Sequence, residues 1–340
     1  MKKVELVPGY FISPVIKGGW QLSTGHSLNA KIAEHDAIAD IKTFVDAGIS
    51  TLDFGDIYTG VEELVGKALK EIGQRDSVQL HTKYVPNEKF LETYDRSDAR
   101  SIVLRSLDRL GVSTVDLVQF HWWRYEAHHY LSALEELFLL KEERLIREVG
   151  ITNFDLPRLT EMVDAGFKPA SIQLQYSVLD RRPEEGMVDY CRDHAIGILC
   201  YGTVAGGFLS ERFLNVPEPN TYETRSNVKY KLIIDDFGGW ELFQELLHCL
   251  ATIASAHEVD IGTISSAYTL NQPGVKGVIV GARNLDHLQN NLMIPEVVLT
   301  DEENASIAHV LGRSTGPTGP VYDLERYNER HRSIMHTNNN

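Results

Sequence analysis

Short apolar runs recur along the chain and alternate with longer segments that have helical spacing. The runs are rich in Val, Ile, Leu and Tyr and are bounded by turn residues, which predicts β-strands. Several are almost continuously apolar, as expected for strands that are covered on both faces. The predicted strands are Val15–Leu22, Ile49–Phe54, Ser77–Tyr84, Val115–His121, Ile146–Thr152, Ser171–Tyr176, Ile196–Tyr201 and Val275–Gly281.

The segments between these runs have the pattern of amphipathic helices. In the first of them, Ile38, Ile41, Phe44 and Val45 fall on one helical face, and Gly48 follows as a stop signal. The predicted helices are Ala30–Ala47, Val61–Ile72, Ser97–Leu110, His128–Glu143, Asp155–Ala165, Glu184–His194, Trp240–Leu270 (one helix or two) and Asn284–Leu292.

Strand and helix therefore alternate about eight times, which favours an α/β fold of the (β/α)8 or TIM-barrel type. The alternative is a doubly wound open sheet. Against it, no G-x-G-x-x-G follows the first strand and no G-x-x-x-x-G-K-[ST] occurs. A length of 340 residues allows two domains, but barrels of this size are single units. We therefore expect one catalytic domain over residues 1–313 and a partly flexible tail over residues 314–340.

Two stretches break the alternation. The segment Thr203–Gly239 is too long for an ordinary loop after the seventh strand, and it mixes basic with aromatic residues. It is either a solvated insertion or a lid over a ligand, and the sequence leaves both open. The tail, Gly312–Asn340, begins with Gly-Pro pairs. A short exposed helix is expected around Arg326, Arg330 and Arg332, with a disordered Asn-rich end.

Charge excludes some classes of partner. The chain has 33 Lys and Arg against 48 Asp and Glu, a net charge of −15. Such a surface repels nucleic acid and anionic lipid, so neither is an expected partner. Any site for a phosphorylated ligand must be locally basic. The oligomeric state is not indicated.

The cysteines indicate the redox compartment of the protein, and the spacing of the histidines indicates whether it binds a metal. Cys191, Cys200 and Cys249 are odd in number and form no C-x-x-C motif, which favours a reducing compartment. No apolar run has the length of a signal peptide or of a spanning helix, about 18 residues. We therefore expect a cytoplasmic protein. The pair His128-His129 lacks a partner at metal-binding spacing, so no metal is expected.

The predicted strands end in polar residues. Barrel enzymes carry their catalytic groups at the carboxyl ends of the strands, where all eight meet at one mouth. These ends, with Tyr58 in the loop after the second strand, are Asp53, Lys83, His121, Thr152-Asn153, Gln173, Tyr201 and Gly281-Ala282-Arg283. The sequence therefore predicts a single site at the mouth.

At these positions the chain resembles the aldo-keto reductase family. The resemblance runs from about Gly18 to Leu292, with its motifs in order at the strand ends. They are Leu52-Asp53-Phe54-Gly55-Asp56-Ile57-Tyr58 followed by Glu62–Leu69, His81-Thr82-Lys83, Gln119-Phe120-His121-Trp122, Gly150-Ile151-Thr152-Asn153-Phe154, Gln173-Leu174-Gln175-Tyr176 and Val280-Gly281-Ala282-Arg283-Asn284.

The resemblance implies a catalytic tetrad of Asp53, Tyr58, Lys83 and His121. Carbonyl reduction needs a proton for the oxygen, and a free phenol, with a pKa near 10, gives it up poorly at neutral pH. An ammonium at ~4 Å interacts with a phenolate by roughly 4 kcal/mol, enough to lower that pKa by a few units at most. We expect Lys83 to supply this charge, Asp53 to hold Lys83, and His121 to donate a hydrogen bond to the carbonyl oxygen.

The resemblance also implies a nicotinamide cofactor. Arg283 suits a 2′-phosphate, which favours NADP(H), whereas His287 stands where the family often has a second cation, so NAD(H) stays open. The family's Ser-Pro-Leu is replaced here by Gly202-Thr203-Val204, so this chain has no serine at that position. The expected cofactor residues are Thr152, Asn153, Gln173, Tyr201, Gly202, Val204, Gly206, Gly281, Ala282, Arg283, His287, Asn290 and Asn291.

The expected pocket wall is aromatic: Trp20, Tyr84, Trp122 and Trp123. The sequence thus predicts NADP(H)-dependent reduction of an aldehyde, ketone or sugar carbonyl, or the reverse oxidation, with Tyr58 as general acid. An alternative is a nicotinamide-binding sensor or regulatory subunit with little turnover, because potassium-channel β subunits resemble the same family. A more distant alternative is a metal-dependent barrel enzyme.

Overall fold

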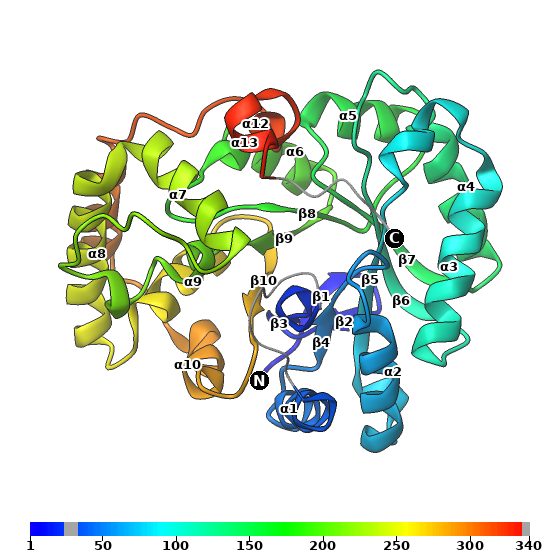
Figure 1. The fold of residues 1–340 in the computed structure, drawn as a ribbon, viewed down its shortest axis with the longest axis horizontal. Coiled ribbons are helices and arrows are strands. Elements are labelled where there is room, and N and C mark those ends of the chain that lie inside the picture. Colours follow the sequence, from blue (N-terminus) through cyan, green and yellow to red (C-terminus); the bar gives the residue numbers. More distant parts are fainter. Residues whose placement is uncertain (24–32, 335–340) are drawn as a thin grey trace.

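Eight parallel strands form a closed barrel, which confirms the predicted fold. The computed structural model describes residues 1–23 and 33–334. Each strand pairs with its neighbour in the chain, and the last pairs with the first. Figure 1 shows helices around this ring of strands. The barrel strands are β3 (Val15–Gly18), β4 (Thr51–Asp53), β5 (Gln79–Tyr84), β6 (Val115–Phe120), β7 (Ile146–Thr152), β8 (Ser171–Gln175), β9 (Gly197–Tyr201) and β10 (Val275–Gly281).

Nine helices lie where the sequence predicts them. The region 240–270 is two helices, and residues 30–32 of the first predicted helix lie outside the described residues. The nine are α1 (Glu34–Asp46), α2 (Val61–Ile72), α3 (Arg96–Leu110), α4 (Tyr130–Glu142), α5 (Leu156–Asp164), α6 (Met187–Asp193), α8 (Gly239–Ala256), α9 (Ile261–Leu270) and α10 (Leu288–Met293). The short helix expected around Arg326, Arg330 and Arg332 is split into α12 (Asp323–Tyr327) and α13 (Glu329–Arg332). Two further helices among the described residues were not predicted: α7 (Arg225–Phe237) and α11 (Asp301–Leu311).

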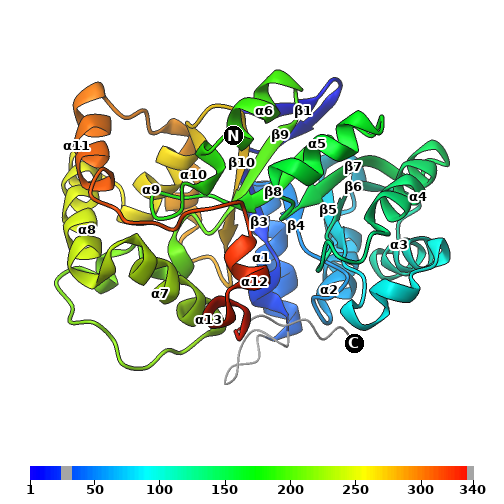
Figure 2. The ribbon, with the colours of Figure 1, turned by 90° about the horizontal axis from the view of Figure 1, so that it is seen from above.

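The structure has an N-terminal hairpin that the hydrophobic pattern did not predict. It closes the end of the barrel opposite the carboxyl ends of the strands, called the lower end below. Its strands β1 (Val4–Val7) and β2 (Tyr10–Ile12) pair antiparallel around a turn in which Gly9 has a φ of 77°. Leu6, Tyr10 and Ile12 pack with Leu117 inside the barrel. Figure 2 shows this dark blue hairpin and the red α12–α13 tail on opposite sides of the molecule.

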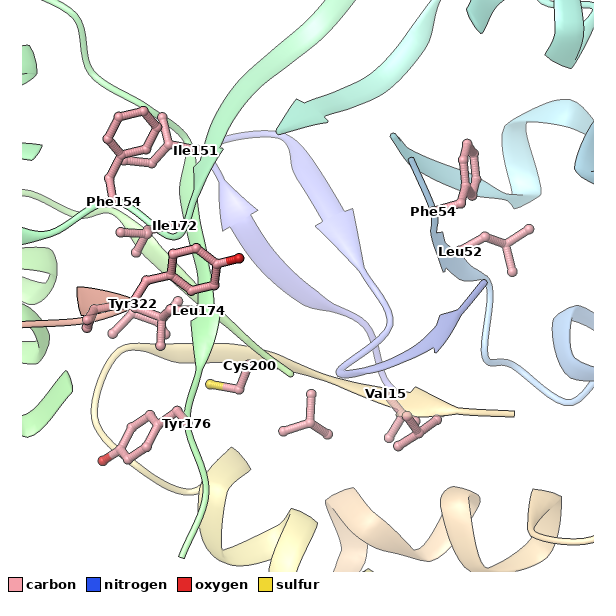
Figure 3. Packing of buried hydrophobic residues seen from close by; sticks show 14 of the residues in the cluster. Val15, Leu52, Phe54, Ile151, Phe154, Ile172, Leu174, Tyr176, Cys200 and Tyr322 are labelled. Atoms are coloured by element: carbon pink, nitrogen blue, oxygen red, sulfur yellow. The ribbon is translucent and has the colours of Figure 1, made fainter. Parts of the chain in front are cut away.

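The larger core lies between strands and helices. Side chains alternate along a strand, so every second residue faces the helices. Phe54, Ile151, Ile172 and Leu174 belong to this buried cluster, as does Tyr322 from the tail (Figure 3). The other residues of the strands face the barrel axis, and at the mouth these are polar.

The long segment after β9 is solvated only in its middle, where residues 215–218 are exposed, and it is packed at both ends. It contains α7, which begins at Thr224, whose side chain accepts from the backbone N–H of Asn227. Tyr230 and Phe237 are buried. Its first turns line the cavity described below. Whether the segment moves as a lid stays a prediction.

The tail is not an exposed helix at Arg326, which is only 6% exposed. Its guanidinium donates to the backbone oxygens of Trp122 and Trp123, at 2.9 and 3.2 Å, and its carbon lies 4.1 Å from the ring centre of Tyr125. The tail therefore packs against the loop after β6. The expected disorder of the Asn-rich end concerns residues 335–340, outside the described residues.

All three cysteines are free, and Cys191 and Cys200 are buried. In the described part of the chain, no helix combines the length and the apolar character needed to cross a bilayer. A reducing, cytoplasmic location stays a prediction.

Candidate active site

A cavity of about 630 Å³ opens at the carboxyl ends of the barrel strands. It brings together most residues that the sequence singled out, although they come from all eight barrel strands or the loops after them. The predicted residues that line it are Trp20, Asp53, Tyr58, Lys83, His121, Trp123, Thr152, Asn153, Gln173, Tyr201, Gly202, Val204, Gly206, Gly281, Ala282, Arg283 and His287. Trp20 lies in a single 3-10 turn (Trp20–Leu22) after β3 rather than in the strand.

Lys83 is held in place by β4. Its ammonium donates to Asp53 Oδ1 at 2.5 Å and to the backbone oxygen of Phe54 at 2.9 Å. The same nitrogen lies 5.2 Å from the ring centre of Tyr58. Lys83 and Asp53 are almost fully buried. Adjacent parallel strands thus hold an amine beside a phenol at the rim of the barrel.

Asp53 is fixed by two glutamines from across the barrel. Its Oδ2 accepts from Gln119 Nε2 at 2.6 Å and from Gln173 Nε2 at 2.7 Å. Gln173 also donates to Gln119 Oε1 at 2.8 Å. A carboxylate with both oxygens bonded cannot swing away, so it orients Lys83. Gln119 was quoted in a motif but not predicted as a site residue.

The pKa of Tyr58 is raised, whereas the sequence argument expected Lys83 to lower it. Burial raises the pKa of Tyr58, and the charge of Lys83 opposes that rise without reversing it. Burial also lowers the pKa of Lys83, but Asp53 and Tyr58 outweigh burial, so the pKa of Lys83 is raised overall. At neutral pH the site therefore holds a neutral phenol beside an ammonium.

His121 is buried and neutral. Its Nδ1 lies 3.3 Å from the backbone oxygen of Thr152, and a carbonyl oxygen only accepts, so this contact places the proton on Nδ1. Burial and then the charge of Arg326 lower the pKa of His121 to about 3. Nε2 has no hydrogen-bond partner among the described residues. In this tautomer Nε2 accepts, whereas the sequence argument expected it to donate to a carbonyl oxygen.

Two of the predicted wall residues do not line the cavity. Tyr84 stacks on Phe120, with ring centres 5.6 Å apart, and Trp122 donates to the backbone oxygen of Ala127 at 2.8 Å. Both are fully buried on the helix side. The alternation of side chains explains the error, because Tyr84 directly follows the inward-facing Lys83. The same holds for Trp122 after His121.

Two of the expected cofactor residues, Asn290 and Asn291, also lie away from the cavity. Asn290 donates to Asp260, the N-cap residue of α9, and Asn291 is buried on α10. Neither borders the cavity. Asn290 therefore belongs to the packing between α9 and α10, whereas Arg283 and His287 border the cavity.

Other cavity residues were missed by the sequence argument. Arg225, Lys229 and Tyr230 come from α7, and Tyr322 comes from the tail. A signal for α7 was present, because Tyr230, Ile233, Ile234 and Phe237 follow helical spacing. No local signal places Tyr322, whose ring lies 5.6 Å from that of His121.

The cavity has the features of a nucleotide site. At Gly202, with a φ of 81°, a Cβ atom would lie 2.4 Å from Tyr230 Oη, so only glycine lets α7 approach this closely. Arg225 and Ser226, in the first turn of α7, face the same space. A helix N-terminus with a cation suits phosphate oxygens. Within residues 1–23 and 33–334, no group of three or more His, Cys, Asp or Glu is arranged to hold a metal ion.

Comparison with known proteins agrees with this geometry. The model of the Aldo/keto reductase family matches residues 14–311. The chain is 27% identical over 325 residues to an aldo-keto reductase of Bacillus subtilis, covering 90% of this chain and 92% of that protein. It is 24% identical over 329 residues to an NADH-specific methylglyoxal reductase of Escherichia coli, covering 89% and 96%. The fold is similar to that of an aldo/keto reductase of Klebsiella pneumoniae crystallised with NADP and acetate. That comparison gives a TM-score of 0.68 at 19% identity and covers 91% and 95% of the two chains.

The family match covers most of the chain and coincides with the barrel whose mouth holds the Asp53, Lys83 and Tyr58 cluster. The resemblance found in the sequence is therefore confirmed. The chain belongs to the aldo/keto reductase family and is an oxidoreductase.

Proposed function

We propose that the protein uses NADP(H) to reduce the carbonyl group of an aldehyde, ketone or sugar, or to oxidise the corresponding alcohol, with Tyr58 as the proton donor. The observation that carries this proposal is the position of Lys83. Its ammonium is bonded to Asp53 at 2.5 Å and lies 5.2 Å from the Tyr58 ring. A fixed positive charge beside a phenol stabilises the phenolate that proton donation leaves behind.

The proton transfer follows from these contacts. Burial keeps the Tyr58 phenol protonated at rest, as a general acid requires. When Tyr58 gives its proton to the substrate oxygen, Lys83 stabilises the resulting phenolate, and Asp53 holds Lys83 in its charged form. In the tautomer that the contact with Thr152 favours, Nε2 of His121 then accepts a hydrogen bond from the new hydroxyl group. This role for His121 differs from the donation that the sequence argument expected.

The cofactor would supply the hydride when bound. Its residues form three groups along the cavity. Thr152, Asn153, Gln173 and Tyr201 surround the end near Tyr58, and Tyr201 is oriented by a 2.9 Å hydrogen bond to Asn153 Oδ1. Gln173 uses its Nε2 to donate to Asp53 and Gln119. Its amide oxygen can therefore accept a hydrogen bond from a carboxamide. The other two groups would hold the phosphates (Gly202, Val204, Gly206, Arg225 and Ser226) and the adenosine end (Gly281, Ala282, Arg283 and His287).

Arg283 favours NADP(H), since a guanidinium binds a 2′-phosphate in a forked geometry. The Klebsiella relative was crystallised with NADP, whereas the Escherichia coli relative is named NADH-specific. The residue itself must therefore be tested. Arg283→Ala should weaken NADPH binding about 10- to 100-fold and leave NADH binding almost unchanged, as measured by quenching of tryptophan fluorescence. An equal loss for both nucleotides would show that Arg283 does not read the 2′-phosphate.

The reaction is tested by following NADPH absorbance with a panel of aldehydes, ketones and sugars. Turnover of at least one carbonyl compound, lost in Tyr58→Phe, supports the proposal. Nucleotide binding without turnover of any compound would favour a sensor instead.

A further inference from the structure

The mechanism proposed above leaves one buried cation of the cavity without a task. Lys229 lies on α7, and its side chain is only 15% exposed. Its ammonium lies 5.0 Å from the ring centre of Tyr201, 5.7 Å from that of Tyr230 and 5.9 Å from that of Tyr322. It lines the same cavity as Tyr58. An ammonium thus stands among three aromatic rings beside the proposed reaction site.

Lys229 has hydrogen-bonding capacity to spare. Among the described residues its ion-pair partner is Glu325, at 3.5 Å, and an ammonium has three N–H donors. Glu325 is shared, because its other oxygen lies 3.3 Å from Arg182 Nη1. Burial lowers the pKa of Lys229, and Glu325 opposes that effect. A buried charge with unfilled donors is costly unless a ligand supplies the missing acceptors.

The cavity as a whole favours an anion. The charged residues among the described residues that line it are one carboxylate, Asp53, and four cations, Lys83, Arg225, Lys229 and Arg283. Asp53 pairs with Lys83, and Glu325, which lies behind the cavity wall, is shared between Lys229 and Arg182. This local excess of positive charge contrasts with the net charge of −15 for the chain. Opposite charge inside a concave site raises the local concentration of an anionic ligand.

The position of Lys229 indicates where the anion lies. The Tyr322 ring neighbours both Lys229 and His121. Its centre lies 5.9 Å from the Lys229 ammonium and 5.6 Å from the centre of the His121 ring. One aromatic ring therefore separates the ammonium from the proposed position of the substrate oxygen. An anionic group at Lys229 would belong to the same small molecule as a carbonyl group at Tyr58, a few atoms away.

We propose that Lys229 binds a carboxylate of the substrate, so that the enzyme prefers aldehydes and ketones that carry a carboxylate a few atoms from the carbonyl group. This inference rests on the function proposed above. The same ammonium chemistry would also suit a phosphate oxygen of the cofactor, and the experiment separates these two sources.

The test compares matched substrates that differ in the carboxylate: 4-oxobutanoate with butanal, and 4-carboxybenzaldehyde with benzaldehyde. Wild-type enzyme should have the higher kcat/KM for the charged member of at least one pair. Lys229→Met keeps the length of the side chain and removes the charge. It should lower kcat/KM for that charged substrate about 10- to 100-fold and change kcat/KM for the neutral one less than threefold. Lys229→Arg should restore part of the preference.

Lys231→Met is the matched control. Lys231 lies on the same helix but pairs with Glu218 at 2.6 Å and does not line the cavity. It should leave the ratio of the two kcat/KM values unchanged. The dissociation constant of NADPH, measured by fluorescence, should be the same in wild type and Lys229→Met.

Three outcomes overturn the inference. An equal loss for both substrates together with weaker NADPH binding assigns Lys229 to the cofactor phosphate. An unchanged substrate ratio in a folded Lys229→Met enzyme, shown by an unchanged thermal midpoint, means that Lys229 binds neither. A wild type that does not prefer the charged substrate in either pair also rejects it. Turnover of the neutral aldehydes in any of these cases would leave the proposed function standing.

Discussion

Each end of the barrel places a tyrosine next to a titratable side chain, but only Tyr10 is fully buried, whereas Tyr58 borders a cavity. At the lower end, Tyr10, from strand β2 of the N-terminal hairpin, has its Oη 2.8 Å from His81 Nε2. At the mouth, Tyr58 lies beside the Lys83 ammonium and faces a cavity. Burial raises the pKa of both tyrosines. The buried Lys83 ammonium opposes the rise at Tyr58, whereas Arg147 and Arg75, which are not buried, oppose it at Tyr10.

The difference lies in what covers each end. The hairpin places Leu6, Tyr10 and Ile12 inside the barrel, so the lower end is filled and its tyrosine is bonded within the protein. At the mouth, the loops, α7 and the tail border an open space instead of filling it. The same barrel therefore provides stability at one end and a reactive site at the other, as the fold generally does.

Removing each phenol is the sharpest way to break this comparison. Tyr58→Phe should lower turnover by about 10²–10⁴-fold, because the proton donor is lost while the ring remains. NADPH affinity and the thermal midpoint should change little. Steady-state kinetics with the best substrate of the panel measures the effect. Rates close to those of wild type would reject Tyr58 as the acid.

Tyr10→Phe should have the opposite result. It leaves buried His81 without its partner at Nε2, which should cost about 1–3 kcal/mol of the free energy of unfolding. Turnover of the folded enzyme should stay within about twofold of wild type. Denaturant unfolding and kinetics on the same preparation test both parts. A large loss of turnover without a loss of stability would mean that the two ends are not separate in function.

The smallest expected effect is on how the free energy of unfolding changes with each pH unit. It concerns Asp56, a buried carboxyl group near the mouth. Burial, and then the charge of Glu62, raise its pKa to about 8 from an ordinary value of 3.8. The folded state therefore binds a proton more tightly than the unfolded chain, and its contribution to stability is lost as the pH rises from about 4 to 8. Asp56→Asn should flatten this slope by at most about 1.4 kcal/mol per pH unit.

Unfolding free energies measured at several pH values between 5 and 8 give the slope for the variant and for wild type. Equal slopes would show that Asp56 is ionised in the folded protein over this range.

The sequence argument was accurate where a position depends on residues nearby in the chain, and less accurate where it depends on packing between distant segments. Lys83 and His121 could be located because each stands at the end of an apolar run, and parallel strands bring such ends together. Tyr84 and Trp122 were misplaced because each adjoins a site residue in sequence, while the side-chain alternation turns it to the helix side. The helix α7 was missed because basic residues interrupt its apolar face.

The sequence alone determined the barrel, its strand order and the polar residues at its mouth, because periodic burial and strand direction are local properties of the chain. Only the tertiary structure decided which residues face the cavity from other elements. Tyr322 lies 201 positions after His121 in the chain, yet their rings are in contact. Lys229 meets Glu325 in the same way. Such contacts depend on how the tail and α7 pack against the barrel, and no local pattern of residues encodes that packing.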